Sequence, residues 1–204
     1  MRLNLTSNLP VAFGLPTLSN DTISAPLFRA FGETTAIATT VKFQQGYGHY
    51  VAAPVVKGKD LCSLLPTDIG KSEAYFYKSE ILLKASVAAL AKALVFDFLI
   101  GNIDRHNGNV YKADSGKLYL IDHERSFGDS KVLFFNKVFR HTLKAKRHLD
   151  EPIEPDFQAE AIAVAESFEP YRQESGLDVV TFKQRIAKLK SSRKLSDLSL
   201  AIIP

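Results

Sequence analysis

A long apolar helix that leads into a loop of asparagines and aspartates constrains the fold of this chain more than any other feature. Residues 79–98 are rich in Ala, Leu and Lys and contain neither Gly nor Pro, which predicts one helix that stops at Gly101. A polar loop covers 102–109, and the apolar runs 110–112 and 118–121 predict a hairpin with an Asp-Ser-Gly turn. This order predicts that polar side chains of the loop and of the second strand converge.

The rest of the chain predicts an α+β fold in which strands come first and helices follow. Residues 36–43 and 50–55 are rich in β-branched and aromatic side chains and predict a second hairpin. Pro54 restricts the second of these strands to a sheet edge, and Lys57-Gly58-Lys59 predicts a turn. Helical segments are expected at about 131–145, 155–168 and 179–190.

Composition places the chain among soluble globular proteins. Hydrophobic residues make up 46% of the 204 residues and charged residues 24%, which is enough apolar material for a core. The single cysteine, Cys62, excludes an intrachain disulfide, and its leucine neighbours predict a small core residue. Residues 1–17 lack the apolar stretch of a signal peptide, and the longest apolar run, 93–100, is too short to span a membrane. We therefore expect a cytoplasmic protein without a membrane span.

The positive charge is concentrated in one segment. The net charge of the chain is +4, and residues 131–149 contain six Lys or Arg and no acidic residue. One interpretation is an amphipathic helix whose lysine and arginine stems cover a core face. The other is a docking surface, over 131–147, for an anionic peptide or a lipid headgroup. The basic residues fit no recognition-helix motif, so we expect no nucleic-acid partner.

Three oxygen-bearing side chains stand out by their positions around the loop. Asp104 opens it, Asn109 closes it five residues later, and Asp122 ends the second strand of the hairpin. Phosphoryl transfer needs a carboxylate that accepts the proton of the attacking hydroxyl, and two further oxygen ligands for Mg²⁺. The Asp-x-x-x-x-Asn interval is that of the protein-kinase catalytic loop. The alternative is that an Asn- and Asp-rich loop serves only as a turn.

The motifs of this region resemble two related groups of kinases. Asp104-Arg105-His106-Asn107-Gly108-Asn109, followed by Ile121-Asp122, resembles the signature of phosphatidylinositol 3/4-kinase-like enzymes. The lead-in Leu-Ile-Gly-Asn-Ile and the ending Tyr-Leu-Ile-Asp-His resemble bacterial HipA-like kinases more closely. The resemblance implies a protein-kinase-like fold with ATP and Mg²⁺ as cofactors. It implies a small, incomplete β-rich N-terminal lobe, residues 1–60, on a mainly helical lobe, residues 61–204.

The same resemblance assigns roles to the site residues. Asp104 would be the catalytic base, and Asn109 and Asp122 would bind Mg²⁺ and thereby the nucleotide. Arg105 and His106 would support the loop or contact phosphate. The residues against which the adenine would lie are Ala53, Val55, Val56 and Lys57. The expected reaction is phosphorylation of a protein Ser or Thr hydroxyl, with a lipid kinase as the alternative.

The nucleotide-binding elements that precede the hinge of a kinase are not evident. Gly46-Tyr47-Gly48 is a lone GxG that a hairpin turn explains. Lys42 is the candidate for the nucleotide-binding lysine, but it is too close in sequence to the hinge, the segment expected to face adenine, to leave room for the helix that lies between the two in a kinase. Gly14-Leu15-Pro16 resembles weakly the turn after the glutamate-bearing helix of kinases. The chain would then be truncated, completed by a partner chain that supplies the missing strands, or a pseudokinase that regulates a partner.

Overall fold

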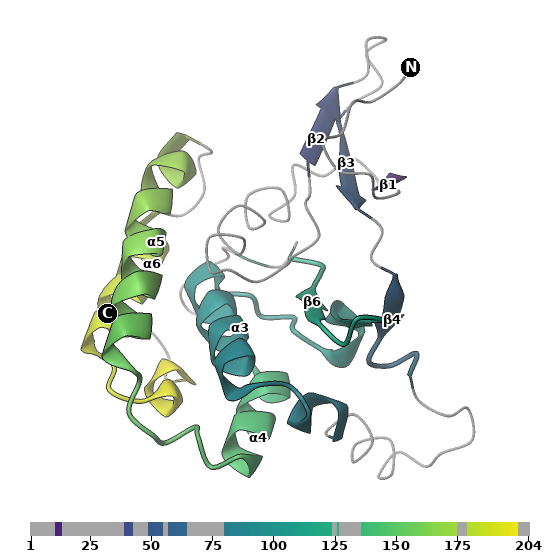
Figure 1. The fold of residues 1–204 in the computed structure, drawn as a ribbon. Coiled ribbons are helices and arrows are strands. Elements are labelled where there is room, and N and C mark those ends of the chain that lie inside the picture. The colour runs from purple at the N-terminus through teal and green to yellow at the C-terminus, as the bar shows by residue number, and fades with distance from the viewer. Residues whose placement is uncertain are drawn as a thin grey trace.

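The described part of the chain forms two small antiparallel sheets and a set of helices, as a computed structural model shows (Figure 1). Strands come first along the chain and helices dominate its second half, so the predicted α+β class is confirmed. The residues that the structure describes are 11–13, 39–42, 49–54, 57–64, 80–123, 126, 136–174 and 179–199.

The first sheet has the strand order β1-β3-β2. Strands β2 (Thr39–Lys42) and β3 (His49–Pro54) pair antiparallel, which confirms the predicted hairpin. Strand β1 (Val11–Phe13) pairs with the other side of β3. The prediction that β3 lies at an edge is therefore wrong. Pro54 is the last residue of β3, opposite Val11, so its missing N–H falls at the end of the ladder, where it disrupts little.

The second sheet has the strand order β4-β5-β6, and its strand β5 directly follows the predicted loop in the chain. Strands β5 (Val110–Ala113) and β6 (Leu118–Leu120) form the predicted hairpin, with Val110 opposite Leu120. Strand β4 (Gly58–Asp60) pairs antiparallel with β5. Sequence reasoning missed β4, because three residues that contain a glycine carry no strand pattern of their own.

The turn predicted at Lys57-Gly58-Lys59 is wrong, since Gly58 begins β4. Gly58 has φ +154°, and a Cβ at this position would lie 2.3 Å from the backbone oxygen of Lys112. The glycine thus permits close approach of two strands rather than a turn. The chain turns after Asp60, whose carboxylate accepts the backbone N–H of Cys62 at 2.8 Å. Cys62 is exposed at this turn, so the prediction of a core cysteine is also wrong.

The central helix, α3 (Val87–Ile100), begins later than predicted. Residues 80–83 are helical, but the chain then turns, and Ser86 caps a new helix by accepting the N–H of Ala89 at 3.1 Å. A serine cap satisfies an amide that the first helical turn leaves unpaired. The predicted end is confirmed, because Gly101 has φ 61° and donates its N–H back to Asp97 and Phe98.

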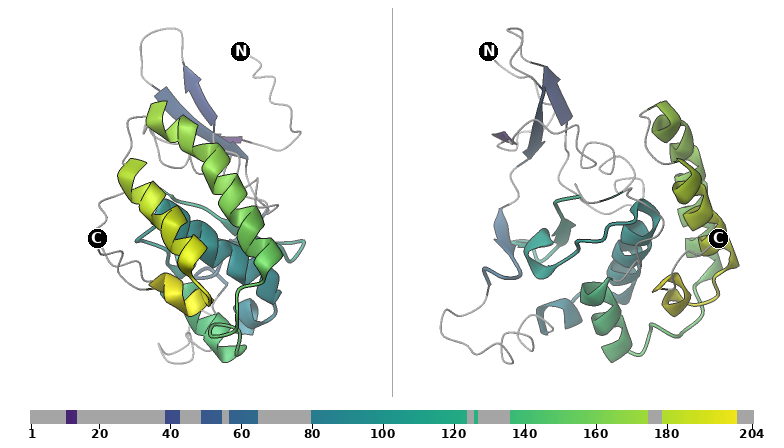
Figure 2. Two further views of the ribbon diagram at one scale, coloured as in Figure 1. Left: turned by 90° about the vertical axis from the view of Figure 1, so that its left-hand side faces the viewer. Right: turned by 180° about the vertical axis from the view of Figure 1, so that it is seen from behind.

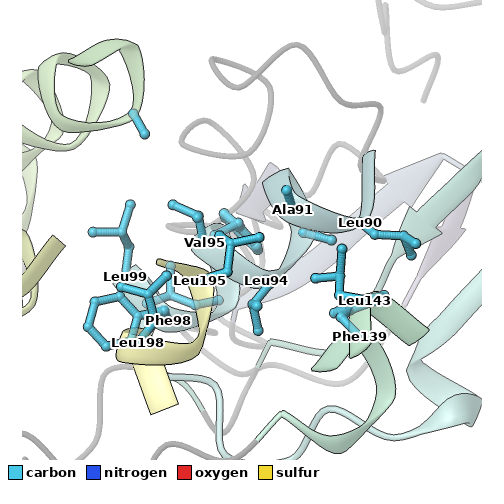
Figure 3. Close-up of a cluster of buried hydrophobic side chains, with 14 of the residues drawn as sticks. Leu90, Ala91, Leu94, Val95, Phe98, Leu99, Phe139, Leu143, Leu195 and Leu198 are labelled. Carbon is cyan, nitrogen blue, oxygen red and sulfur yellow. The ribbon is translucent and has the colours of Figure 1, made fainter. Parts of the chain in front are cut away.

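Helix α3 is the centre of the hydrophobic core (Figure 3). Ten of its fourteen residues, Leu90, Ala91 and all of 93–100, are buried. Each fully buried large side chain contributes about 1.5–3 kcal/mol of transfer free energy. Apolar side chains from later elements pack around this helix: Phe139 and Leu143 of α4 (Lys137–Ala145), Phe182, Ile186 and Leu189 of α6 (Val179–Ser191), and Leu195 and Leu198 of the 3-10 helix η2 (Leu195–Ser199). One apolar stripe of α6 is thus buried in this core.

The basic segment forms α4 (Lys137–Ala145) in its described part. Phe139 and Leu143 are buried in it while Lys144 is exposed, so an amphipathic helix is confirmed there. Residues 131–135 lie outside the described residues. Docking of an anionic partner on this segment stays a prediction.

The last two helices, α5 (Pro155–Glu174) and α6 (Val179–Ser191), lie side by side on one flank of the molecule (Figures 1 and 2). Gln158 of α5 ties them together by donating to the carbonyl oxygens of Leu189 and Ser192 at 2.6 and 2.9 Å. Helix α5 is longer than predicted and continues through Pro170, which removes one intrahelical hydrogen bond. Among the described helices, none is long and apolar enough to cross a membrane. The predicted lobe boundary at residue 60 stays a prediction.

Candidate active site

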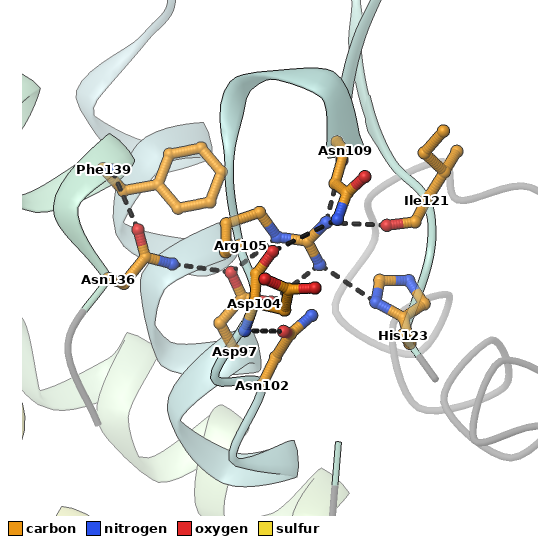
Figure 4. Close-up of polar contacts among 9 residues, drawn as sticks. All are labelled: Asp97, Asn102, Asp104, Arg105, Asn109, Ile121, His123, Asn136 and Phe139. Atoms are coloured by element: carbon orange, nitrogen blue, oxygen red, sulfur yellow. Dashed lines mark hydrogen bonds and ion pairs between the residues drawn. The ribbon is translucent and has the colours of Figure 1, made fainter. Parts of the chain in front are cut away.

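The loop between α3 and β5 (Figure 4) carries four of the predicted site residues, Asp104, Arg105, His106 and Asn109. It closes with a short 3-10 helix, η1 (Asn107–Asn109), which His106 caps by accepting the N–H of Gly108 on Nδ1 at 3.1 Å. A Cβ on Gly108 would lie 3.0 Å from the imidazole of His106, so a glycine suits this close approach. The Asn109 N–H also returns to the His106 carbonyl at 3.0 Å. These bonds define the path of the loop's second half.

A buried ion pair anchors the loop to α3. Arg105 donates from Nε to Oδ2 of Asp97 and from Nη2 to Oδ1, both at 2.9 Å. Neither side chain is exposed. The two parallel bonds fix the plane of the guanidinium as well as its position, since a carboxylate and a guanidinium match in geometry.

The same guanidinium reaches the backbone around both predicted metal ligands. Its Nη1 donates to the carbonyl oxygens of Asn109 at 2.8 Å and Ile121 at 2.7 Å, and its Nη2 lies 2.9 Å from Nδ1 of His123. The backbone N–H of Ile121 also donates to the carbonyl of Asn109 at 3.2 Å. Arg105 thus binds the backbone of Asn109, which is one predicted metal ligand. It also binds Ile121 and His123, which are the chain neighbours of the other predicted ligand, Asp122.

Asp122 has a backbone conformation that few non-glycine residues adopt. Its φ is 57°, in the left-handed region, and its side chain is exposed. Asp is one of the few side chains enriched there, yet such a conformation is held only where neighbouring contacts determine it. The bonds from Arg105 to Ile121 and His123 are those contacts. With these contacts on either side of it, Asp122 is exposed just after the end of β6.

Asn109 and Asp104 are joined directly. Nδ2 of Asn109 donates to the backbone oxygen of Asp104 at 3.1 Å, which orients the amide and leaves Oδ1 as the end that can accept or ligate. The backbone N–H of Asp104 donates to Oδ1 of Asn102 at 2.9 Å. Nδ2 of Asn102 is buried and has no hydrogen-bond partner within the part of the chain that the structure describes. The base candidate Asp104 is therefore held from both sides through its backbone.

The buried charges of the site have opposed electrostatic effects. Burial raises the pKa of Asp97, while Arg105 and Asn136 lower it by stabilising the carboxylate. Three donors converge on this carboxylate and stabilise its charged form. Burial, and then the charge of Arg105, hold the pKa of His123 well below its usual range. Its imidazole is neutral, so Nδ1 accepts from the guanidinium, which can only donate, and the ring packs edge-on against Phe96 at 5.3 Å.

Asn109 binds the backbone of Asp104, and Arg105 joins Asn109 to Ile121 and His123 (Figure 4). Ile121 and His123 are the two chain neighbours of Asp122. Arg105 is buried and its described contacts support the loop, which is one of the two roles expected for it. His106 is exposed and caps η1.

The residues predicted to face adenine are only partly described. Ala53 lies in β3 opposite Ala12, and Lys57 is exposed just before β4, where its carbonyl accepts the N–H of Asp114 at 3.1 Å. Val55 and Val56 lie outside the described residues. The adenine site stays a prediction.

Sequence reasoning missed three residues that build the site: Asp97, His123 and Asn136. The signal for Asp97 was present, because a carboxylate in the middle of an apolar helix must find a partner when it is buried. Its partner Asn136 is 39 positions away, and no local pattern predicts such a contact.

A cavity of about 600 Å³ between the first turns of α3 and α5 is separate from this site. Its lining includes Val87, Lys92 and Phe157 and none of the predicted site residues. The chemistry predicted from the sequence therefore belongs to the loop around Arg105 and not to this cavity.

Comparison with known proteins adds evidence of two kinds. A family model described as phosphatidylinositol 3- and 4-kinase matches residues 69–187, which is more than half of the chain. The fold is similar to the crystal structure of a Helicobacter pylori proinflammatory kinase, CtkA, with a TM-score of 0.52 and 12% identity, covering 96% of this chain and 88% of that chain. At this identity the likeness concerns the fold, and it confirms the predicted kinase-like fold. No curated protein matches the chain significantly.

Proposed function

Because this chain belongs to the phosphatidylinositol 3- and 4-kinase family, we propose that it transfers the γ-phosphoryl group of ATP to a hydroxyl, with Mg²⁺ as cofactor. The observation that carries this proposal is the set of bonds from Arg105 to Asn109, Ile121 and His123. One buried guanidinium holds together the two segments that bear the oxygen ligands a metal-bound nucleotide needs.

The donor set fits Mg²⁺ bound together with nucleotide. Oδ1 of Asn109 and the exposed carboxylate of Asp122 are hard oxygen ligands, and Mg²⁺ completes its coordination with phosphate oxygens and water. Among the described residues no group of three His, Cys, Asp or Glu could hold a metal ion by itself. We therefore assign the metal to Asn109 and Asp122 in the presence of ATP. Bound there, it would neutralise charge on the transferred phosphoryl group.

Asp104 is the proposed base. Its side chain is half-buried, and its backbone is fixed by Asn102 on one side and Asn109 on the other. A carboxylate held in this way can orient the acceptor hydroxyl and take its proton as the bond to phosphorus forms. The adenine would lie along the chain between β3 and β4, near Ala53 and Lys57.

We propose a protein Ser or Thr hydroxyl as the acceptor. This choice depends on the resemblance of the Asn-Ile-Asp-Arg-His and Leu-Ile-Asp-His motifs to HipA-like kinases. The family description favours a lipid acceptor as the second candidate. The lack of an identified nucleotide lysine favours a third, a pseudokinase or one part of a split kinase that acts through a partner.

Thermal unfolding with and without saturating ATP and Mg²⁺ tests the nucleotide site. A ligand at one hundred times its dissociation constant adds about 2.7 kcal/mol to stability, which raises the midpoint of a chain of this size by about 5–10 °C. We expect that rise in the wild type with metal present, and its loss in Asp122→Asn. A matched control is Asp114→Asn, an exposed aspartate in the β5–β6 turn.

Transfer of labelled phosphate then separates the candidates. Label on a Ser/Thr peptide library supports the protein acceptor, and label only on phosphatidylinositol vesicles replaces it with the lipid acceptor. Nucleotide binding without transfer to either acceptor favours a pseudokinase. Absence of any metal-dependent shift in the wild type contradicts the proposed nucleotide site.

A further inference from the structure

We infer that Asn136, at the start of α4, is a positioning residue for the metal-binding loop and acts on it through Asp97 and Arg105. Asn136 lies outside every motif that indicated the site, and it is 39 positions from Asp97 in the sequence. The inference rests on the proposed function, because it concerns the geometry in which Mg²⁺ and ATP are held.

Both the oxygen and the nitrogen of the Asn136 side-chain amide form hydrogen bonds. Oδ1 accepts the N–H of Phe139 at 3.0 Å, which makes Asn136 the N-cap of α4. Nδ2 donates to Oδ2 of Asp97 at 2.6 Å. Asn136 is 1% exposed and Asp97 is fully buried, so neither bond faces solvent. A helix cap alone needs only the oxygen, which serine, threonine or aspartate also supply. The Nδ2 contact is an additional feature that capping does not explain.

The carboxylate of Asp97 connects Asn136 to the site, because it also binds Arg105. Its Oδ2 accepts from both Asn136 and Nε of Arg105, while its Oδ1 accepts from Nη2 of Arg105 (Figure 4). Nη1 of Arg105 holds the carbonyls of Asn109 and Ile121. Asn136 is therefore separated from the backbone of a proposed metal ligand by two side chains, and each link is a buried hydrogen bond of 2.6–2.9 Å.

Loss of the Nδ2 donor would remove the contact that holds the Asp97 carboxylate from the α4 side, so the bonded pair of Asp97 and Arg105 could tilt as a unit. The carboxylate would keep Arg105, but the plane of the pair would no longer be fixed from the α4 side. Outer contacts that orient metal ligands typically contribute 10–100-fold to metal affinity or activity. We therefore expect formation of α4 and the geometry of the metal-binding loop to be coupled.

Asn136→Ser tests this coupling. Its hydroxyl can still cap α4, but it has no donor that reaches Asp97 in the way an amide does. Ser86→Ala is the matched control, because it removes the cap of α3 at a helix end that does not contact Arg105. For both variants we would measure the dissociation constants of Mg·ATP and of metal-free ATP by calorimetry, and the phosphate-transfer rate. Hydrogen exchange in peptides over 104–109 and 118–123 would report the loop directly.

We expect Asn136→Ser to weaken Mg·ATP binding or slow transfer about tenfold or more, with metal-free ATP binding unchanged and faster exchange over 104–109. Ser86→Ala should change none of these. Equal effects in the two variants, or no effect in Asn136→Ser, would overturn the inference. If the wild type binds no nucleotide, the proposed function fails. Hydrogen exchange then decides: faster exchange in Asn136→Ser alone upholds the positioning role, and equal exchange refutes it.

Discussion

Asp97 and Arg105 form a two-pronged ion pair in the interior of the protein, with both N–O distances at 2.9 Å and neither side chain exposed to solvent. Asp97 lies on α3, in the centre of the core, and Arg105 lies in the loop that α3 leads into. The loop is thus attached to the helix at the centre of the described core by charge and geometry together. This relationship explains how a loop rich in Asn, Asp and Gly is held in one geometry, which the proposed binding of a metal-bound nucleotide requires.

Removal of one partner of this ion pair should be strongly destabilising. Asp97→Asn leaves the guanidinium buried without a counter-charge, and breaking a buried pair in this way costs about 3–5 kcal/mol. Glu166→Gln is the comparison, because Glu166 pairs with Lys190 at the surface, where both side chains are about half exposed, and such pairs contribute about 0–1 kcal/mol. Urea unfolding of both variants measures the difference. Equal and small losses would show that the buried pair is not a structural anchor.

Stability should fall as the pH drops below about 6.5, because of His123. Its pKa is well below the usual value in the folded state and returns to about 6.5 on unfolding, so below that pH the unfolded chain binds the extra proton. This contribution is complete above the unfolded pKa and is lost toward acid, by at most about 1.4 kcal/mol per pH unit. The contribution of Asp97 has the opposite sign, because burial raises its pKa in the folded state. That contribution is complete below the unfolded pKa of 3.8 and is lost as the pH rises through the raised folded pKa.

His123→Asn isolates the histidine contribution. Its amide oxygen can accept from Arg105 in place of Nδ1, but it does not titrate between pH 4 and 8. We expect the difference in unfolding free energy between wild type and variant to shrink as the pH is lowered from 7 to 5. A constant difference over that range would show that protonation of His123 does not contribute to the pH dependence of stability.

Two glycine substitutions separate backbone strain from steric clash. Gly116→Ala, in the β5–β6 turn, places a methyl at φ 85° with no other atom within 4 Å, so it should cost only the left-handed strain of about 1–2 kcal/mol. Gly58→Ala adds a contact of 2.3 Å with the backbone of Lys112, which cannot move without breaking the β4–β5 pair. Chemical unfolding should show a clearly larger loss for Gly58→Ala. Similar losses would mean that β4 is free to separate from β5.

The parts of this structure that the sequence predicts are those with a local physical cause. The apolar run that becomes α3, the glycine that ends it and the β5–β6 hairpin depend on residues close together in the chain. The positions of Asp104, Asn109 and Asp122 around them follow from the same local order. The resemblance to kinase motifs depends on that short stretch as well.

The parts that sequence reasoning missed depend on contacts between distant segments. Strand β4 exists because Gly58 can approach β5, more than fifty residues later, and the three-residue segment has no pattern of its own. The contact of Asn136 with Asp97 likewise requires α4 to be placed beside α3. The late start of α3 is a different case, because Ser86 was a visible cap signal that the surrounding Ala and Leu residues obscured.

Asp104→Asn should separate chemistry from binding at the proposed site. We propose Asp104 as the general base and not as a metal ligand, so the variant should bind Mg·ATP with nearly the affinity of the wild type. Its transfer rate should fall by about 10²–10⁴-fold, the usual contribution of a general base. Asp122→Asn should lose metal-dependent binding and transfer together, because its carboxylate is a proposed ligand. Calorimetry with Mg·ATP and transfer of labelled phosphate distinguish the two variants. If Asp104→Asn loses binding as completely as Asp122→Asn does, Asp104 is a ligand rather than the base, and the division of roles within the loop must be reversed.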